Sequence, residues 1–278
     1  MNNPSFKEKS IQTASGKIFY YLENSFPDRP TVVFLHGLSS NHTTWKSSVE
    51  AFQKQELNCL LLDMRGHGHS DKTKKRELYN LSVFSQDLGE IIEKENLSKI
   101  ILVGYSFGGY VAIDYSVKQS QNILALILIS ANHVNPLKYR RLIWLTKPLL
   151  RLLTLLSQLL LWQKRKKYHY FDQTKTNSYF SSTFIGLTTM PISINLWMLS
   201  EVFKLNFGQS VSKITCPALI IKSKRDPFLS NTETQDMAKK IRTAKIINLT
   251  ENTHFLGSRN QKELTEAILN FLTQEKII

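Results

Sequence analysis

Seven short apolar runs divide this sequence, and most are separated by a stretch of the right length for one helix. The runs are rich in β-branched residues, and the stretches between them are amphipathic. Strands that alternate with helices in this way form a mostly parallel sheet with helices on both faces. We therefore predict an α/β fold, with strands near 17–23, 31–35, 57–62, 100–104, 123–129, 217–222 and 244–249 and helices near 43–55, 80–96, 107–119, 231–241 and 261–274.

One interval between predicted strands is far too long for a simple connection. It runs from about Ser130 to Pro217 and carries most of the surplus of basic residues and leucines. A chain of 278 residues can hold one α/β core with an insertion. We predict that residues 1–132 and 211–278 form the core and that residues 133–210 form a helical cap. Because prolines end or kink helices, several short cap helices are predicted, divided at Pro136, Pro148 and Pro191.

The charge of the chain is strongly positive and unevenly distributed. Thirty-six Lys and Arg residues stand against 22 Asp and Glu residues, which gives a net charge of +14. Residues 115–200 hold eleven basic side chains and a single acid, Asp172, so this segment contributes +10. A basic surface attracts anionic partners. Because the charge accompanies leucines and no nucleic-acid recognition motif, an anionic lipid surface is favoured and no nucleic acid is expected as a partner.

Neither cysteine is predicted to carry chemistry. Cys59 and Cys216 each lie beside a predicted buried strand, and their spacing fits neither a zinc site nor a disulfide framework. We interpret both as small apolar core residues. Residues 1–8 lack the apolar run of a secretory signal, which predicts a cytoplasmic, reducing location.

A serine lies at a predicted strand-to-helix turn. The pentapeptide Gly-Tyr-Ser-Phe-Gly at residues 104–108 follows an apolar run and precedes a helix-like segment. Such a turn projects the hydroxyl of Ser106 above the sheet, and it requires small neighbours at the strand and helix. The helix N-terminus would stabilise an oxyanion, to which the N–H of Phe107 would donate. The same string also occurs as an ordinary turn in other folds, so by itself it leaves the function open.

A serine hydroxyl is inert until an oriented base removes its proton, so the chain must also supply a histidine and an acid. Where such a turn carries a nucleophile, the acid and then the histidine follow it in the chain. This order leaves His133, His169 and His254, of which the first two fall in the predicted cap. His254 follows the last predicted strand, at the carboxyl edge of the sheet where Ser106 also emerges. We predict that His254 is the base.

Asp226 is the predicted acid. No carboxylate follows the strand 123–129, where the chain reads Ser-Ala-Asn. Asp226 comes just after the strand 217–222, at the carboxyl edge where ligand sites of open α/β sheets collect. An Asp-Pro pair is also an ordinary turn. Its joint placement with Ser106 and His254 favours the catalytic interpretation.

Two further segments combine glycine with histidine. In Leu-His-Gly-Leu at residues 35–38, the N–H of Leu38 would be a second donor to an oxyanion, while His36 is predicted to be a local hydrogen-bonding residue and not a second base. Loss of one such donor typically costs about 3 kcal/mol in the activation barrier. His67 and His69 have no further ligand cluster nearby in the sequence, so we interpret them as part of a tight turn and not as a metal site.

Together these motifs resemble the α/β-hydrolase superfamily, and within it the esterases, monoacylglycerol lipases and related hydrolases with helical caps. The resemblance covers nearly the whole chain. It implies a mostly parallel central sheet with helices on both faces and a helical cap insertion. It further implies a catalytic triad of Ser106, Asp226 and His254, an oxyanion hole formed by the N–H groups of Leu38 and Phe107, no cofactor and no metal. The residues that carry it are His36-Gly37, Asp63-x-Arg65-Gly66-x-Gly68-x-Ser70, Gly104-Tyr105-Ser106-Phe107-Gly108-Gly109, Asp226-Pro227 and His254-Phe255.

Two positions depart from the pattern of the superfamily. Ser223 and Thr253 stand where glycines commonly precede the acid and the histidine, which bears on the geometry of both loops. Dehalogenases and epoxide hydrolases of the superfamily carry an aspartate nucleophile, and Ser106 argues against both activities. Three functions stay open: hydrolysis of carboxylic esters through an acyl-enzyme, carbon–carbon cleavage or acyl transfer by the same triad, and a ligand receptor with low turnover.

Residues 142–162 contain long leucine runs on which Lys147, Arg151, Thr154 and Gln158 form a polar stripe. One interpretation is a cap helix that buries its leucines against the core. A transmembrane span is disfavoured, because two buried cations would cost about 5 to 7 kcal/mol and the crossing would separate Ser106 from its partners.

The remaining interpretation of this segment is a helix that lies in a membrane interface. The following Lys164-Arg165-Lys166-Lys167 would add about 1 kcal/mol per residue near an anionic surface. Residues 138–167 would then contact an anionic membrane, with the protein peripheral on the inner membrane surface. If the cap also roofs the active site, aromatic residues such as Trp144 and Trp162 favour an apolar acyl chain. We therefore predict a small-molecule, lipid-like ester of the monoacylglycerol type as substrate.

Overall fold

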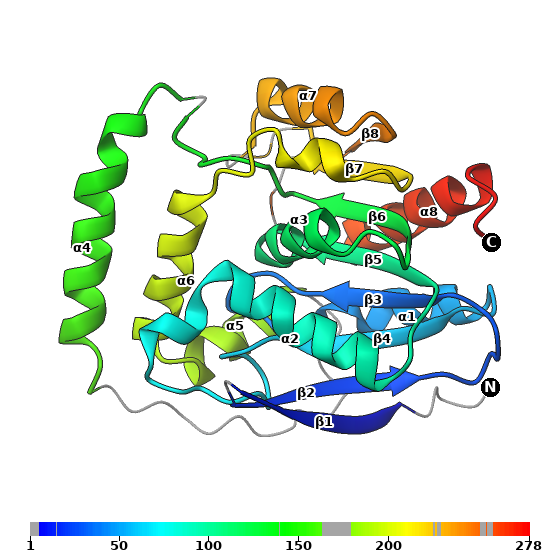
Figure 1. The fold of residues 1–278 in the computed structure, drawn as a ribbon, viewed down its shortest axis with the longest axis horizontal. Coiled ribbons are helices and arrows are strands. Elements are labelled where there is room, and N and C mark those ends of the chain that lie inside the picture. The colour runs from blue at the N-terminus through cyan, green and yellow to red at the C-terminus, as the bar shows by residue number, and fades with distance from the viewer. Residues whose placement is uncertain are drawn as a thin grey trace.

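The computed structural model contains an eight-stranded sheet flanked by helices (Figure 1). It describes residues 6–14, 16–138, 140–162, 179–224, 226, 229–250, 254 and 258–278. The order of strands across the sheet is β1-β2-β4-β3-β5-β6-β7-β8, and all pairs from β4 to β8 are parallel. The strands are β1 (Lys7–Thr13), β2 (Gly16–Glu23), β3 (Thr31–Leu35), β4 (Asn58–Asp63), β5 (Ile100–Tyr105), β6 (Ile123–Ile129), β7 (Ala218–Ser223) and β8 (Ala244–Leu249).

The α/β fold predicted from the alternating apolar runs is confirmed, with one addition at the edge of the sheet. Strand β1 pairs antiparallel with β2, which itself pairs antiparallel with β4. The sequence of β1, Lys-Glu-Lys-Ser-Ile-Gln-Thr, is largely polar and only partly buried. An edge strand needs no apolar surface on both faces, so hydrophobicity gave no signal for it.

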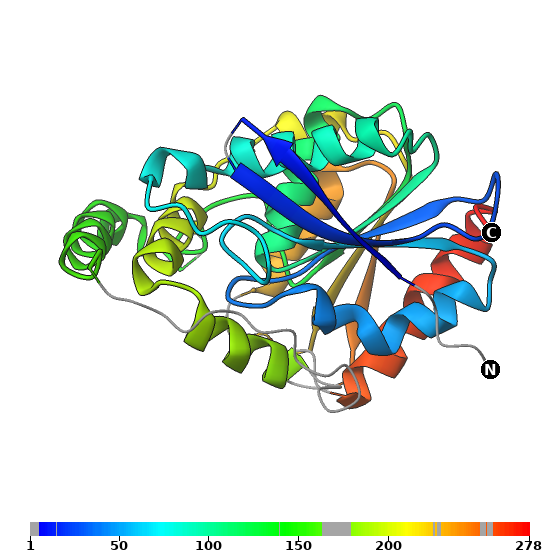
Figure 2. The same ribbon diagram turned by 90° about the horizontal axis from the view of Figure 1, so that it is seen from below.

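Helices cover both faces of the sheet, as Figure 2 shows. Helices α1 (Lys46–Gln53) and α8 (Ser258–Gln274) pack on one face, whereas α2 (Leu81–Lys94), α3 (Phe107–Lys118) and α7 (Asn231–Lys240) lie on the other. Side chains alternate along each strand, so neighbouring residues enter different cores. In β3, Val32 and Phe34 join the cluster under α1 and α8, while Val33 and Leu35 join the cluster under α2 and α3.

In the described part of the long interval between β6 and β7, the α-helices are α4 (Thr146–Leu159), α5 (Tyr179–Thr189) and α6 (Ile192–Lys204). They lie beyond the carboxyl ends of the parallel strands, with α4 farthest from the sheet (Figures 1 and 2). Helix α6 is anchored in the core through Ile194 and Met198, which are fully buried. Pro148 lies in the first turn of α4, where the missing N–H costs no hydrogen bond, and Pro191 caps α6.

Four short 3₁₀ helices complete the described elements: η1 (His42–Trp45), η2 (Arg76–Tyr79), η3 (Ile143–Leu145) and η4 (Ser210–Lys213). Cys59 lies within β4 and Cys216 just before β7, and both are free and buried. Burial raises the pKa of the Cys216 thiol to about 11. None of the described helices has the length and apolarity needed to cross a bilayer.

Candidate active site

Ser106 occupies a strained turn between β5 and α3. Its φ angle is 49°, in the left-handed region that non-glycine residues rarely adopt, and its N–H donates to the carbonyl of Ile129 at 2.8 Å. Two glycines of this turn pack directly against backbone atoms, so a side chain at either position would clash. A Cβ at Gly104 would lie 2.6 Å from the carbonyl oxygen of Gly108, and one at Gly108 would lie 2.5 Å from that of Leu35. The local sequence therefore holds the Ser106 hydroxyl at the carboxyl edge of the sheet.

The structure brings His254 and Asp226 to this serine from two distant parts of the chain. His254 Nε2 lies 3.2 Å from Ser106 Oγ, and His254 Nδ1 lies 2.8 Å from Asp226 Oδ2. A carboxylate can only accept, so Nδ1 carries the hydrogen and Nε2 is left as an acceptor for the serine hydroxyl. The hydroxyl of Tyr105 donates to the backbone carbonyl of His254 at 2.8 Å, which ties the histidine to the residue before the serine.

Asp226 is buried among other titratable groups. Its side chain has no exposed area, whereas that of His254 is 10% exposed. Burial lowers the pKa of Lys222, although the negative charge of Asp226 acts in the other direction. For Tyr110, burial and the charge of Asp226 both raise the pKa. Burial likewise raises the pKa of Glu233, which caps the first turn of α7 with Ser230. Asp226 therefore acts on the histidine from a site largely screened from water.

The loop after β3 meets the first turn of α3. A Cβ at Gly108 would also approach the carbonyl oxygen of His36 to 2.6 Å, so the two backbones are in direct contact. Leu38 follows in this loop, and Phe107 begins α3. Among the described residues, the N–H groups of Leu38 and Phe107 have no hydrogen-bond acceptor. Two such donors beside a helix N-terminus are suited to bind an oxyanion.

His67 accepts a hydrogen bond from this loop. The N–H of Ser39, next to Leu38, donates to His67 Nε2 at 3.2 Å, and His67 Nδ1 lies 2.9 Å from the carbonyl of Arg65. Burial lowers the pKa of His67 well below its usual value, so the ring is neutral and can accept at Nε2. The sequence interpretation of His67 as a turn residue missed this contact, because its partner lies 28 residues earlier in the chain.

The other histidines considered from the sequence have different surroundings. His36 bonds locally to Gly37 and accepts from the N–H of Met64 at 3.1 Å. His69 Nδ1 lies 2.6 Å from the hydroxyl of Tyr21. His133 is buried against α7, with Nε2 3.0 Å from Asp236 Oδ2.

His169 lies outside the described residues, as do Thr253, Pro227 and Phe255. Ser223 is the last residue of β7 and is buried.

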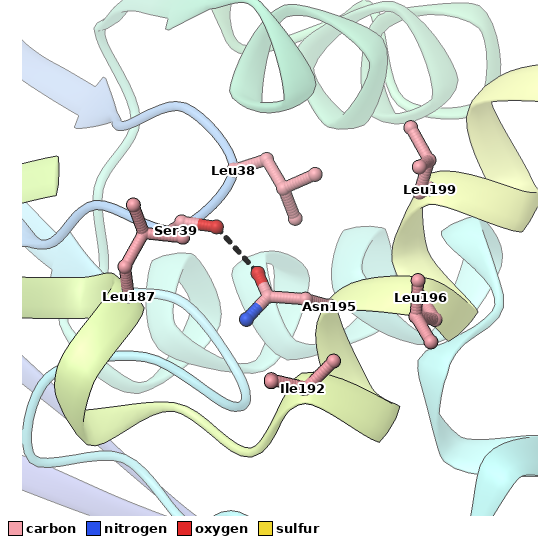
Figure 3. A pocket seen from close by; sticks show the side chains of 7 residues that line it. All are labelled: Leu38, Ser39, Leu187, Ile192, Asn195, Leu196 and Leu199. Carbon is pink, nitrogen blue, oxygen red and sulfur yellow. Dashed lines mark hydrogen bonds between the residues drawn. The ribbon is translucent and has the colours of Figure 1, made fainter. Parts of the chain in front are cut away.

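A pocket of about 370 Å³ separates the β3 loop from the inserted helices (Figure 3). Its lining is almost entirely apolar and comprises Leu38, Ser39, Leu187, Ile192, Asn195, Leu196 and Leu199. The hydroxyl of Ser39 donates to the side-chain oxygen of Asn195 across the pocket. Because Leu38 belongs both to this lining and to the pair of free N–H donors, the pocket adjoins the candidate oxyanion site.

Helix α5 touches the same loop through a glycine. A Cβ at Gly186 would lie 2.0 Å from the carbonyl oxygen of Ser39, so only glycine permits this approach. The insertion therefore contacts Ser39 twice, at Gly186 and at Asn195. Neither residue was singled out from the sequence, since Asn195 lies 156 residues from Ser39 and has no local motif.

The sheet, the inserted helices and the serine turn define the class of the α/β hydrolases. The chain belongs to the family described as Hydrolase_4, serine aminopeptidase S33, whose model matches residues 27–254. Curated relatives include epoxide hydrolase 4 of Mus musculus, 31% identical over 119 residues, and epoxide hydrolase 3 of Xenopus tropicalis, 29% identical over 119 residues. Each match covers 43% of this chain, and 33% and 32% of the respective relatives, so the chain spans about a third of their length.

Solved structures show the same fold at low sequence identity. The enol-lactonase from Burkholderia xenovorans LB400 is 17% identical, with a TM-score of 0.72, over 95% of this chain and 100% of that one. A thermophilic esterase from Thermogutta terrifontis is 19% identical, with a TM-score of 0.71, over 97% of this chain and 99% of that one. At these identities the likeness extends to the fold alone.

Proposed function

We propose that this protein is a serine hydrolase that cleaves carboxylic esters through an acyl-enzyme, with Ser106, His254 and Asp226 as its catalytic triad. The observation that carries the proposal is the continuous chain of contacts from Ser106 Oγ to His254 Nε2 at 3.2 Å and from His254 Nδ1 to Asp226 at 2.8 Å. Each distance lies within reach of a hydrogen bond, and the order of donors and acceptors is the one that activates a serine.

In this mechanism Ser106 Oγ attacks the acyl carbonyl while His254 Nε2 takes the hydroxyl proton. Asp226 accepts from Nδ1 and stabilises the imidazolium that forms. The N–H groups of Leu38 and Phe107 bind the oxyanion of the tetrahedral intermediate. His254 then gives the proton to the leaving alcohol, and a water activated by the same nitrogen releases the acid from Ser106.

The substrate class follows from the pocket beside Leu38. Five of its seven lining residues are apolar, Ser39 and Asn195 are polar, and none of the seven is charged. Such a lining favours an aliphatic acyl chain. We propose a lipid-like, monoacylglycerol-type ester, held by residues 133–210 acting as a cap.

Two other substrate classes are suggested by the names of similar proteins. A serine aminopeptidase would use the same triad on a peptide, but recognition of a free amino group calls for a carboxylate, and the described pocket lining contains none. Epoxide hydrolysis is opposed by Ser106, since the superfamily performs it with an aspartate at this position. Carbon–carbon cleavage and acyl transfer use the same triad and remain the alternative enzymatic functions, beside a ligand receptor with low turnover.

A chain-length series of nitrophenyl esters tests the proposal. The wild type should hydrolyse them with a preference for apolar chains, and Ser106→Ala should reduce kcat by a factor on the order of 10⁶. Ser116→Ala is a matched control, because Ser116 is also in the α3 region and its buried hydroxyl has no partner among the described residues. Equal hydrolysis by the wild type and Ser106→Ala would refute the triad.

Parallel measurements separate the alternatives. A fluorophosphonate probe should label the wild type and Ser116→Ala but not Ser106→Ala. Labelling without turnover on any ester would favour the receptor. Faster turnover of an aminoacyl nitroanilide, an epoxide or a diketone than of every ester would instead identify a different substrate class.

A further inference from the structure

The outer face of α4 is apolar and exposed. Leu152, Leu155 and Leu159 are 51%, 53% and 58% exposed, and their spacing of three and four residues places them on one side of the helix. The opposite side holds Leu153 and Ser157, which are buried. Some leucines of α4 are therefore buried, and others are exposed to solvent. Contiguous exposed apolar residues of this size mark a site of interaction.

Tryptophans flank this face at both ends of the helix. Trp144, in η3 just before α4, is 67% exposed, and Trp162, three residues past its end, is 77% exposed. Ile143 beside Trp144 is 50% exposed. Tryptophan is the side chain most enriched where hydrocarbon meets water, because its ring is apolar and its N–H is polar.

Basic side chains border the apolar face. Residues 138–162 contain five Lys or Arg residues and no acid. Lys147 and Arg151 are exposed on the polar side of α4, the side that also carries Thr154. In the part of the chain that the structure describes, neither Lys147 nor Arg151 takes part in a salt bridge.

A second segment adds cations to the same side. An Arg76 guanidinium nitrogen donates to Thr154 Oγ1 at 3.2 Å, and the Lys74 ammonium donates to the carbonyl of Leu161. These residues lie between β4 and α2, in a basic run of Lys74, Lys75 and Arg76 that Glu77 follows. Charge from two distant stretches of sequence therefore converges beside α4.

We propose that η3 and α4 form a docking surface for an anionic lipid bilayer, with the exposed leucines and both tryptophans entering the interface. The apolar stripe has tryptophans at both ends, and along one edge lie Lys147 and Arg151, which form no salt bridge with any described residue. This combination fits a charged membrane better than a protein surface, which would need matching acids and a shaped groove. This docking goes beyond the proposed ester hydrolysis and does not depend on it.

Vesicle co-sedimentation tests the proposal on the full-length protein. Vesicles of phosphatidylcholine with phosphatidylglycerol should bind the protein, and binding should weaken with added salt. Lys147→Gln/Arg151→Gln should weaken the partition constant roughly thirtyfold, at about 1 kcal/mol per cation. Leu152→Gln/Leu155→Gln should weaken it by on the order of ten- to a hundredfold, because apolar area is lost from the interface.

Matched controls separate docking from general charge and folding. Lys213→Gln/Lys239→Gln removes the same charge from exposed positions in η4 and α7 and should leave binding within twofold of wild type. All variants should keep the wild-type circular dichroism spectrum and unfolding midpoint. Equal loss in the control pair, or binding of the wild type to neutral and anionic vesicles alike, would overturn the proposal.

Tryptophan fluorescence gives an independent readout. The other two tryptophans, Trp45 and Trp197, are 1% and 5% exposed, so a change in emission reports mainly on the α4 surface. Anionic vesicles should shift the emission to the blue, and Trp144→Phe/Trp162→Phe should abolish the shift. An unchanged spectrum with vesicles would overturn the proposal. So would a dimer that forms without lipid and is lost in Leu152→Gln/Leu155→Gln, since the face would then belong to a second copy of the chain.

Discussion

The serine site and helix α4 differ in how their side chains are held: those of the serine site are hydrogen-bonded to one another, whereas many on α4 are exposed. Ser106, His254 and Asp226 are brought together by strand ends, and each is held by a defined hydrogen bond. On α4, Leu152 and Leu155 are exposed to solvent, and the buried residues Leu153 and Ser157 lie on the other side of the helix. The contrast teaches that strand ends fix the geometry of the serine site, whereas α4, outside the sheet, leaves large apolar side chains exposed.

The largest expected effect separates the two regions by activity. Asp226→Asn replaces the carboxylate that accepts from His254 Nδ1 with a neutral amide that can also donate, which favours the wrong tautomer, so kcat should fall by about 10⁴ while the fold is retained. Leu155→Gln should leave kcat on a soluble ester unchanged. Steady-state kinetics on a nitrophenyl ester checks both. A fall of less than tenfold for Asp226→Asn would detach this carboxylate from the reaction.

The second expected effect compares the two faces of α4 by stability. Leu153→Ala removes a buried side chain and should lower the free energy of unfolding by about 2 to 5 kcal/mol. Leu155→Ala, made on the exposed face, should change it by less than about 0.5 kcal/mol. Urea unfolding of the two variants measures the difference. Similar losses would mean that the outer face is packed in solution.

The third prediction concerns pH and the buried histidine His133. Burial, and next the positive charge of Lys240, lower its pKa to about 4. The unfolded chain therefore takes up this proton near pH 6.5 and the folded protein only near pH 4, so acidification across this range stabilises the unfolded state. Between neutral and acidic pH, the free energy of unfolding of His133→Gln should therefore fall by up to about 3 kcal/mol less than that of the wild type. Unfolding midpoints at pH 7 and pH 4.5 for both proteins test this, and parallel pH dependences would contradict it.

The smallest expected effect concerns the loop under the oxyanion site. His67→Phe leaves the N–H of Ser39 without an acceptor and should lower kcat roughly ten- to a hundredfold, with little change in KM. His67→Gln keeps an acceptor and should recover part of the loss. A rise in KM at constant kcat, or no rescue by glutamine, would show that His67 does not position the donor at Leu38.

The sequence predicted the sheet and its flanking helices more fully than the contacts of the helices between β6 and β7. Strands such as β5 and β6 were found because buried strands are uniformly apolar, whereas the polar edge strand β1 left no such signal. Ser106, Asp226 and His254 could be selected from a local motif and chain order. The contacts of Ser39 with His67 and Asn195 could not, because they join residues 28 and 156 positions apart and depend on how the insertion packs. The basic run at residues 164–167 lies outside the described residues, so its part in membrane contact stays a prediction.

If the proposed ester hydrolysis holds, the close approach of Gly186 to Ser39 would couple the length of the acyl chain to the loop after β3. Leu187, the next residue, lines the pocket, so an acyl chain that displaces α5 also pushes on the loop that carries the Leu38 N–H. A ligand in the pocket would then change the position of the Leu38 N–H. Acyl length should consequently register in the turnover number as well as in affinity, and a redesign that exchanges α5 for another helix would have to preserve a glycine at this contact.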